Sequence, residues 1–186
     1  TLYHEDHAGG LPWLLAQVEA EEFLLPQLSG SEQEALQKDV LALAEDCGAL
    51  VRYIETPRSA ALGEGVLTVY PPVAEGGVNE MGLTVLCTAG EYDFLITGDM
   101  NASTEKKLAA LYELPDVAVL LAGHHGSKGS TSQELLEAVT PEVGIISVGQ
   151  NRFGHPTQEA MDRMAGAGMA LRRTDEEGNI LIQVGK

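Results

Sequence analysis

Three short apolar runs in the second half of the chain constrain its fold more than any other feature. They read FLITG at 94–98, VAVLLAG at 117–123 and VGIISVG at 143–149. Apolar runs of this length, bounded by Gly and polar residues, are typical of strands buried inside a sheet. Because helical patterns separate them, this half of the chain predicts alternating strands and helices, with the helices outside and the sheet within.

The remaining patterns complete the expected order of elements. Helical spacing and capping residues predict helices at 11–18, 31–48, 103–114, 130–141 and 157–168. Short strands are predicted at 49–57 and 65–72, with hairpins over 81–99 and 170–184 that turn at 89–91 and 177–179. Hairpins first and strand–helix units later predict one layered domain over residues 1–186.

The composition is ordinary for a soluble globular protein, apart from a strong acidic bias. Of the 186 residues 44% are hydrophobic, and no apolar run approaches the roughly 20 residues that span a bilayer. Eleven Lys and Arg stand against 28 Asp and Glu, a net charge of −17. Such a surface repels nucleic acid in general, but it does not exclude a phosphodiester at a metal-loaded cleft. The simplest interpretation is solubility. Cys47 and Cys87 are predicted to be core thiols.

All five histidines lie in short Gly-rich or acidic motifs, and none lies in the body of a predicted helix. The motifs are YHEDHAGGL near the start, FLITGDM and VLLAGHHGSKGS at two strand ends, and NRFGHP after a third strand. Their candidate residues are His4, Asp6, His7, Asp99, His124, His125 and His155. Each motif alone is explained equally well by a polar turn. Together they predict a site for a divalent cation such as zinc, which favours imidazole and carboxylate ligands.

These motifs resemble the metallo-β-lactamase superfamily, and within it the branch of ComEC-type domains from DNA-uptake competence proteins. The superfamily motif is H-x-H-x-D-H, and residues 2–7 here read LYHEDH. The branch adds TGD, GHHGS and SVG…NR[YF]GHP, which stand here at 97–99, 123–127 and 147–156. RRTDEEGNILI near the end is similar to the closing hairpin of the branch. The resemblance covers the chain from Tyr3 onward.

The resemblance implies an α/β fold, the four-layer αββα sandwich of the superfamily. We expect this chain to lack the N-terminal strands of that sandwich, because only Thr1 and Leu2 precede Tyr3.

The resemblance also implies the metal ligands. One ion would be held by Asp6, His7, Asp99 and one of the pair His124 and His125. His4 belongs to the second ion of the superfamily, and Leu2 stands where another histidine of that second site belongs. We therefore expect one well-formed metal site and a second that is weak or empty.

The function that the resemblance implies is metal-dependent hydrolysis of a phosphodiester, with zinc as the ion and manganese as the alternative. Asp6 or Asp99 would orient the water, and His155 would donate a proton or contact phosphate. Ser127, Asn151 and Arg152 would bind the substrate. That substrate is expected to be a phosphodiester or nucleotide, with DNA reached through a parent protein and no direct contact between this domain and a membrane. The compartment stays open.

Two alternatives remain at this point. Leu2 favours a catalytically degenerate domain that keeps the fold for an interaction or a structural role. Another chemistry of the superfamily, such as thioester or lactone hydrolysis, is also compatible with a metal site, although GHHGS and GHP together favour phosphodiesters.

Overall fold

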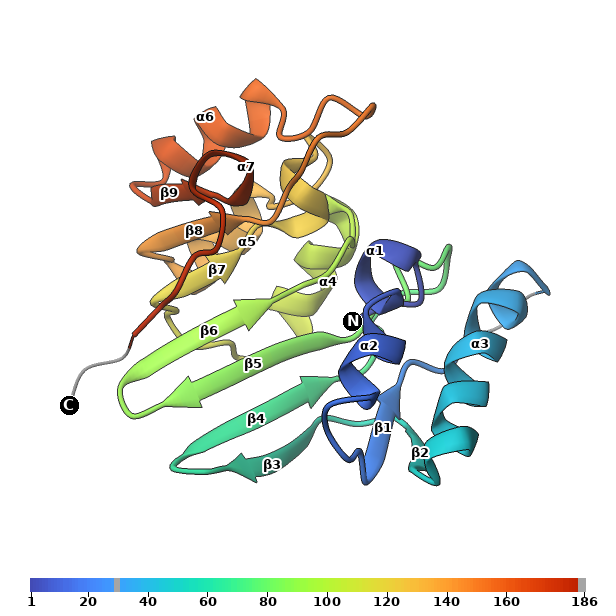
Figure 1. The fold of residues 1–186 in the computed structure, drawn as a ribbon. Coiled ribbons are helices and arrows are strands. Elements are labelled where there is room, and N and C mark those ends of the chain that lie inside the picture. The colour runs from blue at the N-terminus through green and yellow to red at the C-terminus, as the bar shows by residue number, and fades with distance from the viewer. Residues whose placement is uncertain (29–30, 184–186) are drawn as a thin grey trace.

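A mixed β-sheet organises the structure, a computed structural model of the chain (Figure 1). It describes residues 1–28 and 31–183, with the backbone alone at 31–34 and 36. Seven strands form this sheet in the order β3-β4-β5-β6-β7-β8-β9, and β1 pairs with β2 in a separate small sheet. The strands are β1 (Glu22–Leu25), β2 (Leu50–Tyr53), β3 (Arg58–Leu62), β4 (Gly65–Tyr70), β5 (Thr84–Ala89), β6 (Tyr92–Ile96), β7 (Val119–Leu121), β8 (Val143–Ile146) and β9 (Ala170–Arg173).

The helices come before, between and after these strands. They are α1 (Glu5–Ala8), α2 (Leu11–Leu15), α3 (Ser31–Cys47), α4 (Ala102–Leu111), α5 (Gln133–Val139), α6 (Gln158–Gly166) and α7 (Thr174–Glu177), with a 3-10 turn, η1, at Gly123–Gly126. No helix within the described ranges is long and apolar enough to cross a membrane.

The large sheet changes from antiparallel to parallel at β6. Strands β3 to β6 pair antiparallel, with hairpins at β3–β4 and β5–β6, whereas β6, β7, β8 and β9 pair parallel. Parallel neighbours need a crossover connection, and α4, α5 and α6 supply the three crossovers. The prediction of hairpins followed by strand–helix units is confirmed. Because β6, β7 and β8 run in one direction, their carboxyl ends lie at one edge of the sheet.

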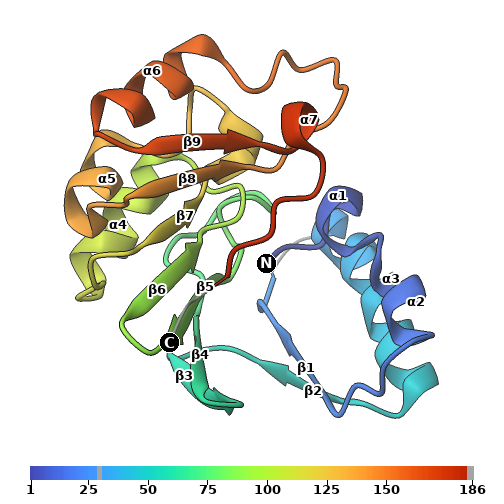
Figure 2. The ribbon, with the colours of Figure 1, turned by 60° about the vertical axis from the view of Figure 1, so that its left-hand side comes forward.

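Helices α4, α5 and α6 cover one face of the large sheet (Figure 2). The main hydrophobic core lies between them and the sheet. Its fully buried members include Leu95, Leu108, Leu120, Leu135, Val139, Ile146 and Met164. The three apolar runs of the sequence are therefore the strands that line this core.

The other face of the sheet is turned towards α1, α2, α3 and the small β1–β2 sheet (Figure 2). A second core there contains Tyr3, Phe23, Leu25, Val40 and Ala44. The structure is thus an α/β fold whose mixed sheet has helices on both sides.

Two details of the expected secondary structure and one of the expected burial are wrong. Strand β3 directly follows the strand predicted at 49–57 and was not expected. The hairpin over 170–184 is absent from its described part, because α7 follows β9 and residues 180–183 form no strand. The acidic run TDEE can start a helix, since carboxylates are favourable in a first turn. Cys47 is exposed at the end of α3 and Cys87 is half-buried, so the expectation of core thiols fails for Cys47.

We predict that the main core sets the stability of the domain. Leu95→Ala removes a side chain with no solvent exposure and should lower the free energy of unfolding by about 2–5 kcal/mol. Leu62→Ala, on the exposed edge strand β3, is the matched control and should cost less than about 1 kcal/mol. Urea denaturation measures both variants, and equal losses would contradict this placement of the core.

Candidate metal centre

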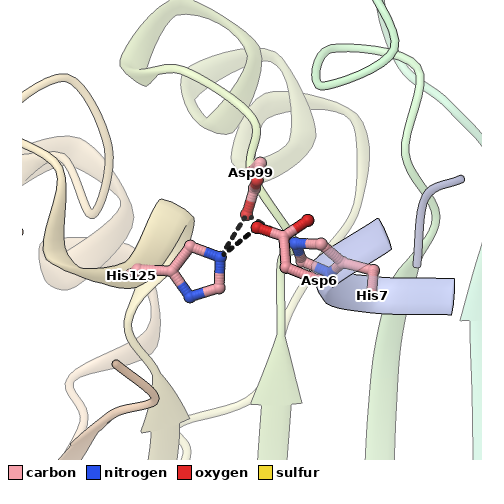
Figure 3. A group of neighbouring side chains, drawn as sticks. All are labelled: Asp6, His7, Asp99 and His125. Carbon is pink, nitrogen blue, oxygen red and sulfur yellow. Dashed lines mark hydrogen bonds and ion pairs between the residues drawn. The ribbon is translucent and has the colours of Figure 1, made fainter. Parts of the chain in front are cut away.

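The carboxyl ends of β6 and β7 and the N-terminal segment meet at one place beside the sheet (Figure 3). Strand β6 leads through Thr97 and Gly98 to Asp99, and β7 leads into the η1 turn with its two histidines. The backbone N–H of His124 donates to the carbonyl oxygen of Gly98 over 3.0 Å, which joins the two loops. Helix α1 carries Asp6 and His7 to the same place from the start of the chain.

Four side chains converge there: Asp6, His7, Asp99 and His125. We call them the metal cluster, because one ligand atom from each lies within 4.8 Å of the others. His7 Nε2 is 3.1 Å from Asp99 Oδ1, and His125 Nε2 is 3.1 Å from Asp6 Oδ2. Two imidazoles and two carboxylates are a donor set that divalent cations accept. The group is therefore capable of binding a metal ion.

The second nitrogen of each cluster histidine is already engaged. His125 Nδ1 lies 2.7 Å from the carbonyl oxygen of Ser147, which can only accept, so this nitrogen carries the proton. His7 Nδ1 lies 3.0 Å from the hydroxyl of Thr1. Such contacts fix the ring and its tautomer in metal-binding histidines. Both Nε2 atoms face carboxylates of the cluster, where they could act as ligands.

The position of His7 Nε2 indicates that a cation fits the cluster. This nitrogen is buried and makes no hydrogen bond, although Asp99 Oδ1 is only 3.1 Å away. At His125, a neutral ring would turn the lone pair of Nε2 towards Asp6 Oδ2. Facing acceptor atoms repel unless a proton or a cation lies between them. A positive ion would satisfy both pairs at once.

Asp99 is the buried anion of the cluster, with 3% of its side chain exposed. Burial would raise the pKa of Asp99, but His7, His124 and His125 outweigh burial and hold this pKa below its ordinary value. Asp99 is therefore ionised at neutral pH, as a metal ligand must be.

The η1 turn holds its histidines in an unfavourable backbone conformation. His124 and His125 have φ of 48° and 54°, in the left-handed region that residues other than Gly seldom adopt, although His, Asn and Asp enter it more often than most. Such residues cost about 1–3 kcal/mol each and persist only when their surroundings impose the geometry.

A buried polar network imposes that geometry. The Gly123 N–H donates to the Thr131 hydroxyl over 2.8 Å. The backbone N–H groups of Thr131 and Ser132 donate to the carboxylate of Glu105 over 2.7 and 2.6 Å. Glu105 comes from α4 and has no solvent exposure. Arg163 of α6 donates to the carbonyl oxygens of Thr131 and Ser130, each over 2.8 Å. The network therefore anchors the turn to two helices.

Sequence reasoning missed Glu105, Thr131 and Arg163. The sequence gives little indication of their role, because an acidic residue and an arginine within amphipathic helices are usually surface residues. Only the fold shows that both point inward to the same loop.

Comparison with known proteins agrees with this geometry. The family model described as the metallo-beta-lactamase superfamily matches residues 3–150, most of the chain and all four residues of the metal cluster. The chain belongs to the metallo-β-lactamase superfamily.

The curated relatives of this superfamily domain are competence and recombination proteins. ComE operon protein 3 of Bacillus subtilis is 27% identical over 95% of the chain and 23% of its own length. Competence protein ComA of Neisseria gonorrhoeae is 37% identical over 53% of the chain and 14% of its own length. Recombination protein 2 of Haemophilus influenzae is 36% identical over 56% of the chain and 13% of its own length. The chain thus spans less than a quarter of the length of each of these relatives.

Among solved structures, CmlA, a diiron β-hydroxylase from Streptomyces venezuelae, shares the fold. Its TM-score is 0.58 at 15% identity, over 92% of this chain and 42% of that chain. A CmlA variant gives a TM-score of 0.59 at 14% identity, over 93% and 42%. At such low identity the likeness concerns the superfamily fold alone.

The superfamily motif residues outside the metal cluster have different surroundings. Leu2 is buried, and among the described side chains His4 is not part of the cluster. His124 Nε2 lies 3.8 Å from Asp99 Oδ2, on the other side of that carboxylate, and its ring contacts the edge of His155 at 5.5 Å between centroids. Of the two histidines in the pair, His125 is therefore the one in the cluster.

Two adjoining cavities give access to the centre. One of about 220 Å³, the cluster cavity, is lined by all four residues of the metal cluster. The other, of about 320 Å³, is the outer cavity, and it is bordered by residues 147–151, Phe153 and His155. Asp6, His125 and Ser147 line both. The outer cavity is therefore the approach to the metal cluster.

Of the three predicted substrate residues, Asn151 lines the outer cavity, whereas Ser127 and Arg152 line neither of these two cavities. Ser127 follows the η1 turn, and its hydroxyl accepts the N–H of Gly129 over 3.3 Å. Arg152 is exposed and forms no ion pair with any residue that the structure describes. Asn151 lines the outer cavity, but its amide makes four hydrogen bonds within its own loop, to residues 149, 153 and 155. This amide shapes the wall of the outer cavity.

Asp99→Ala should abolish metal binding, because it removes the carboxylate that lies among three histidines of the centre. Metal content of dialysed protein, measured by mass spectrometry, checks this expectation. Glu91→Gln removes an exposed charge at the β5–β6 turn and should leave the ratio of metal to protein unchanged. Stoichiometric metal in Asp99→Ala would show that the ligands were misassigned.

Glu105→Gln should weaken metal binding from a distance. The amide nitrogen cannot accept a backbone N–H, so one buried donor of the 131–132 segment loses its partner, at about 1–3 kcal/mol. We expect metal affinity to fall roughly 10-fold or more as the η1 turn loosens. Isothermal titration with zinc measures it. Glu134→Gln, in an exposed ion pair with Lys106, is the control, and equal affinities in both variants would refute the supporting role of Glu105.

Proposed function

We propose that this domain is a metal-dependent hydrolase of phosphodiesters. The observation that carries the proposal is the metal cluster itself, two imidazoles and two carboxylates that line one cavity. Relatives named as competence and recombination proteins favour a nucleic-acid substrate over a thioester or lactone.

In the proposed reaction Asp6, His7, Asp99 and His125 hold the ion. A bound divalent cation supplies Lewis acidity, which activates water at neutral pH and offsets charge on a phosphoryl group. Zinc suits the imidazole ligands, and manganese is the alternative. Asp6 is the most exposed member of the cluster, with 57% of its side chain accessible, and it lines both cavities. We assign Asp6 to orienting the attacking water.

His155 borders the outer cavity and is assigned to the phosphate. Burial and the charges of His124 and His125 lower the pKa of His155, so the ring is neutral at neutral pH. Its Nδ1 is buried without a partner. Orphaned buried N–H groups are rarer than orphaned acceptors, so we assign the proton to Nε2. A neutral ring favours a hydrogen bond from Nε2 to a phosphate oxygen over proton transfer to the leaving group.

Arg152 and Ser127 are the further candidates for phosphate contact. The guanidinium of Arg152 has no ion-pair partner among the described residues and could pair with two phosphate oxygens. With a net charge of −17, the domain has little other means of attracting a strand. DNA would therefore be presented by other parts of a parent protein, and the domain itself needs no contact with a membrane.

We further propose that the fold is a single domain of the four-layer αββα type. The large sheet and its outer helices supply two layers, and the β1–β2 sheet with α3 corresponds to the other two.

One metal site is proposed, because the residues of a second are not assembled. Leu2 is packed in the protein interior next to Gly98, and His4 stands outside the cluster among the described residues. The same observation supports a second candidate function, a degenerate hydrolase domain used for interaction. The intact donor set at the remaining site favours catalysis.

Hydrolysis of bis(p-nitrophenyl) phosphate by metal-reconstituted protein tests the proposal. Wild type should turn over with one ion per chain and lose activity in EDTA. His155→Ala should retain the ion and slow turnover by about 10–100-fold, the scale of a positioned polar group in a reaction centre. Asp99→Ala should lose both the ion and turnover. Protein that holds metal but hydrolyses no diester would favour the interaction domain, and loss of metal from His155→Ala would make that residue a ligand.

A further inference from the structure

An aromatic ring stands in water at the rim of the outer cavity. Phe153 is 82% exposed and lines this cavity together with His155. Exposure alone marks nothing, because single apolar side chains are common on protein surfaces. The surroundings of Phe153 are what set it apart from the other exposed apolar residues.

The loop that carries this ring is held by hydrogen bonds, and the ring stacks on its neighbour. It stacks on His155, with centroids 6.0 Å apart and planes 23° from parallel. Gly154, with φ of +77°, reverses the chain between the two rings, a conformation that favours glycine. The side-chain oxygen of Asn151 accepts the backbone N–H groups of Phe153 and His155 over 3.0 and 3.1 Å. One face of the Phe153 ring is therefore turned to His155 and the other is open to solvent.

The same loop is coupled to the metal cluster. His155 meets His124 edge-on at 5.5 Å, and His124 meets His125 of the cluster at 6.3 Å. Gly126 packs against Pro156 so closely that a Cβ there would come within 2.6 Å of the proline. A row of rings thus leads from the solvent to the candidate reaction centre, and Phe153 is its outer end.

The charge of the protein decides what this open face would bind. Phosphate contacts with Lys and Arg normally supply affinity for nucleic acid, but here 28 acids stand against 11 bases. Stacking of a base on an aromatic ring does not depend on charge and tolerates every base. A ring beside a phosphodiester-cleaving centre can therefore supply the affinity that the acidic surface does not.

We propose that Phe153 is a stacking platform for the nucleobase next to the scissile phosphate, so that the substrate is an unpaired nucleic-acid strand. A paired base is already stacked between its neighbours and does not offer a free face. The outer cavity, at about 320 Å³, is within the usual range for a small-ligand site. This inference rests on the proposed phosphodiesterase function.

The test compares two strands of the same length and phosphate count, an oligothymidylate and an abasic strand with tetrahydrofuran units. With metal-loaded wild type, kcat/KM on the oligothymidylate should exceed that on the abasic strand by about 5- to 150-fold, the range that one stacked base supplies. Phe153→Ala and Phe153→Leu should abolish this preference, mainly through KM. Phe153→Tyr, which keeps a flat ring, should restore it.

A control variant and a binding measurement complete the design. Tyr92→Ala removes another exposed aromatic ring, at the start of β6, and should keep the preference for bases. Equilibrium quenching of a 2-aminopurine strand, with and without Zn²⁺, reports stacking without turnover. The wild-type protein should quench the fluorescence of the 2-aminopurine strand, whereas Phe153→Ala should leave it unchanged.

The outcomes separate the two proposals. Quenching that depends on Phe153, in a protein that hydrolyses no diester, would remove the proposed function and leave the stacking site standing. Diester hydrolysis with no preference for bases, or an equal preference in Phe153→Ala, would overturn the stacking site. A loss of equal size on both strands would do the same, because it would mean that the ring acts on the geometry of His155.

Discussion

The contact of Asp99 with histidines from two other segments is the interaction on which the rest of the centre depends. The Asp99 side chain is only 3% exposed, and its Oδ1 lies 3.1 Å from His7 Nε2 and 4.0 Å from His125 Nε2. A buried anion is costly unless positive charge or hydrogen-bond donors compensate it. The imidazoles provide part of that compensation, and a cation would provide the rest. The N-terminal segment, the end of β6 and the η1 turn are each placed by this requirement.

The scaffold behind Asp99 compensates for a second unfavourable feature, the two left-handed histidines. Parallel pairing of β6 and β7 sets the distance between their loops, and the bond from His124 to Gly98 fixes their register. Glu105 and Arg163 then hold the outer side of the turn from two different helices. The precision needed for metal binding therefore comes from elements without ligands of their own, as is expected when a site is built on rigid elements.

Much of the fold could be predicted from the sequence, because the apolar strands and helix patterns are local signals. The alternation around 117–123 and 143–149 was sufficient to predict strand–helix units with the helices outside the sheet, and the parallel pairing of these strands is what the structure adds. The prediction of a terminal hairpin was wrong because the sequence TDEE is compatible with the first turn of a helix as well as with a turn between strands. The motifs were sufficient to predict the types of ligand. They could not decide between His124 and His125, because that choice depends on two left-handed backbone angles. The role of Glu105 could not be predicted either, because its burial results from tertiary packing alone.

The sequence separation of the cluster residues has a consequence for the whole chain. Asp6 and His125 touch although 119 positions separate them. An ion held by both would act as a cross-link between the first helix and the main sheet, closing a long loop and restricting the unfolded chain. Helix α1 is only four residues long and buries none of them. Bound metal would then slow exchange of the backbone amides of residues 5–8 with solvent water, although burial already holds Leu2 and Tyr3 just before them.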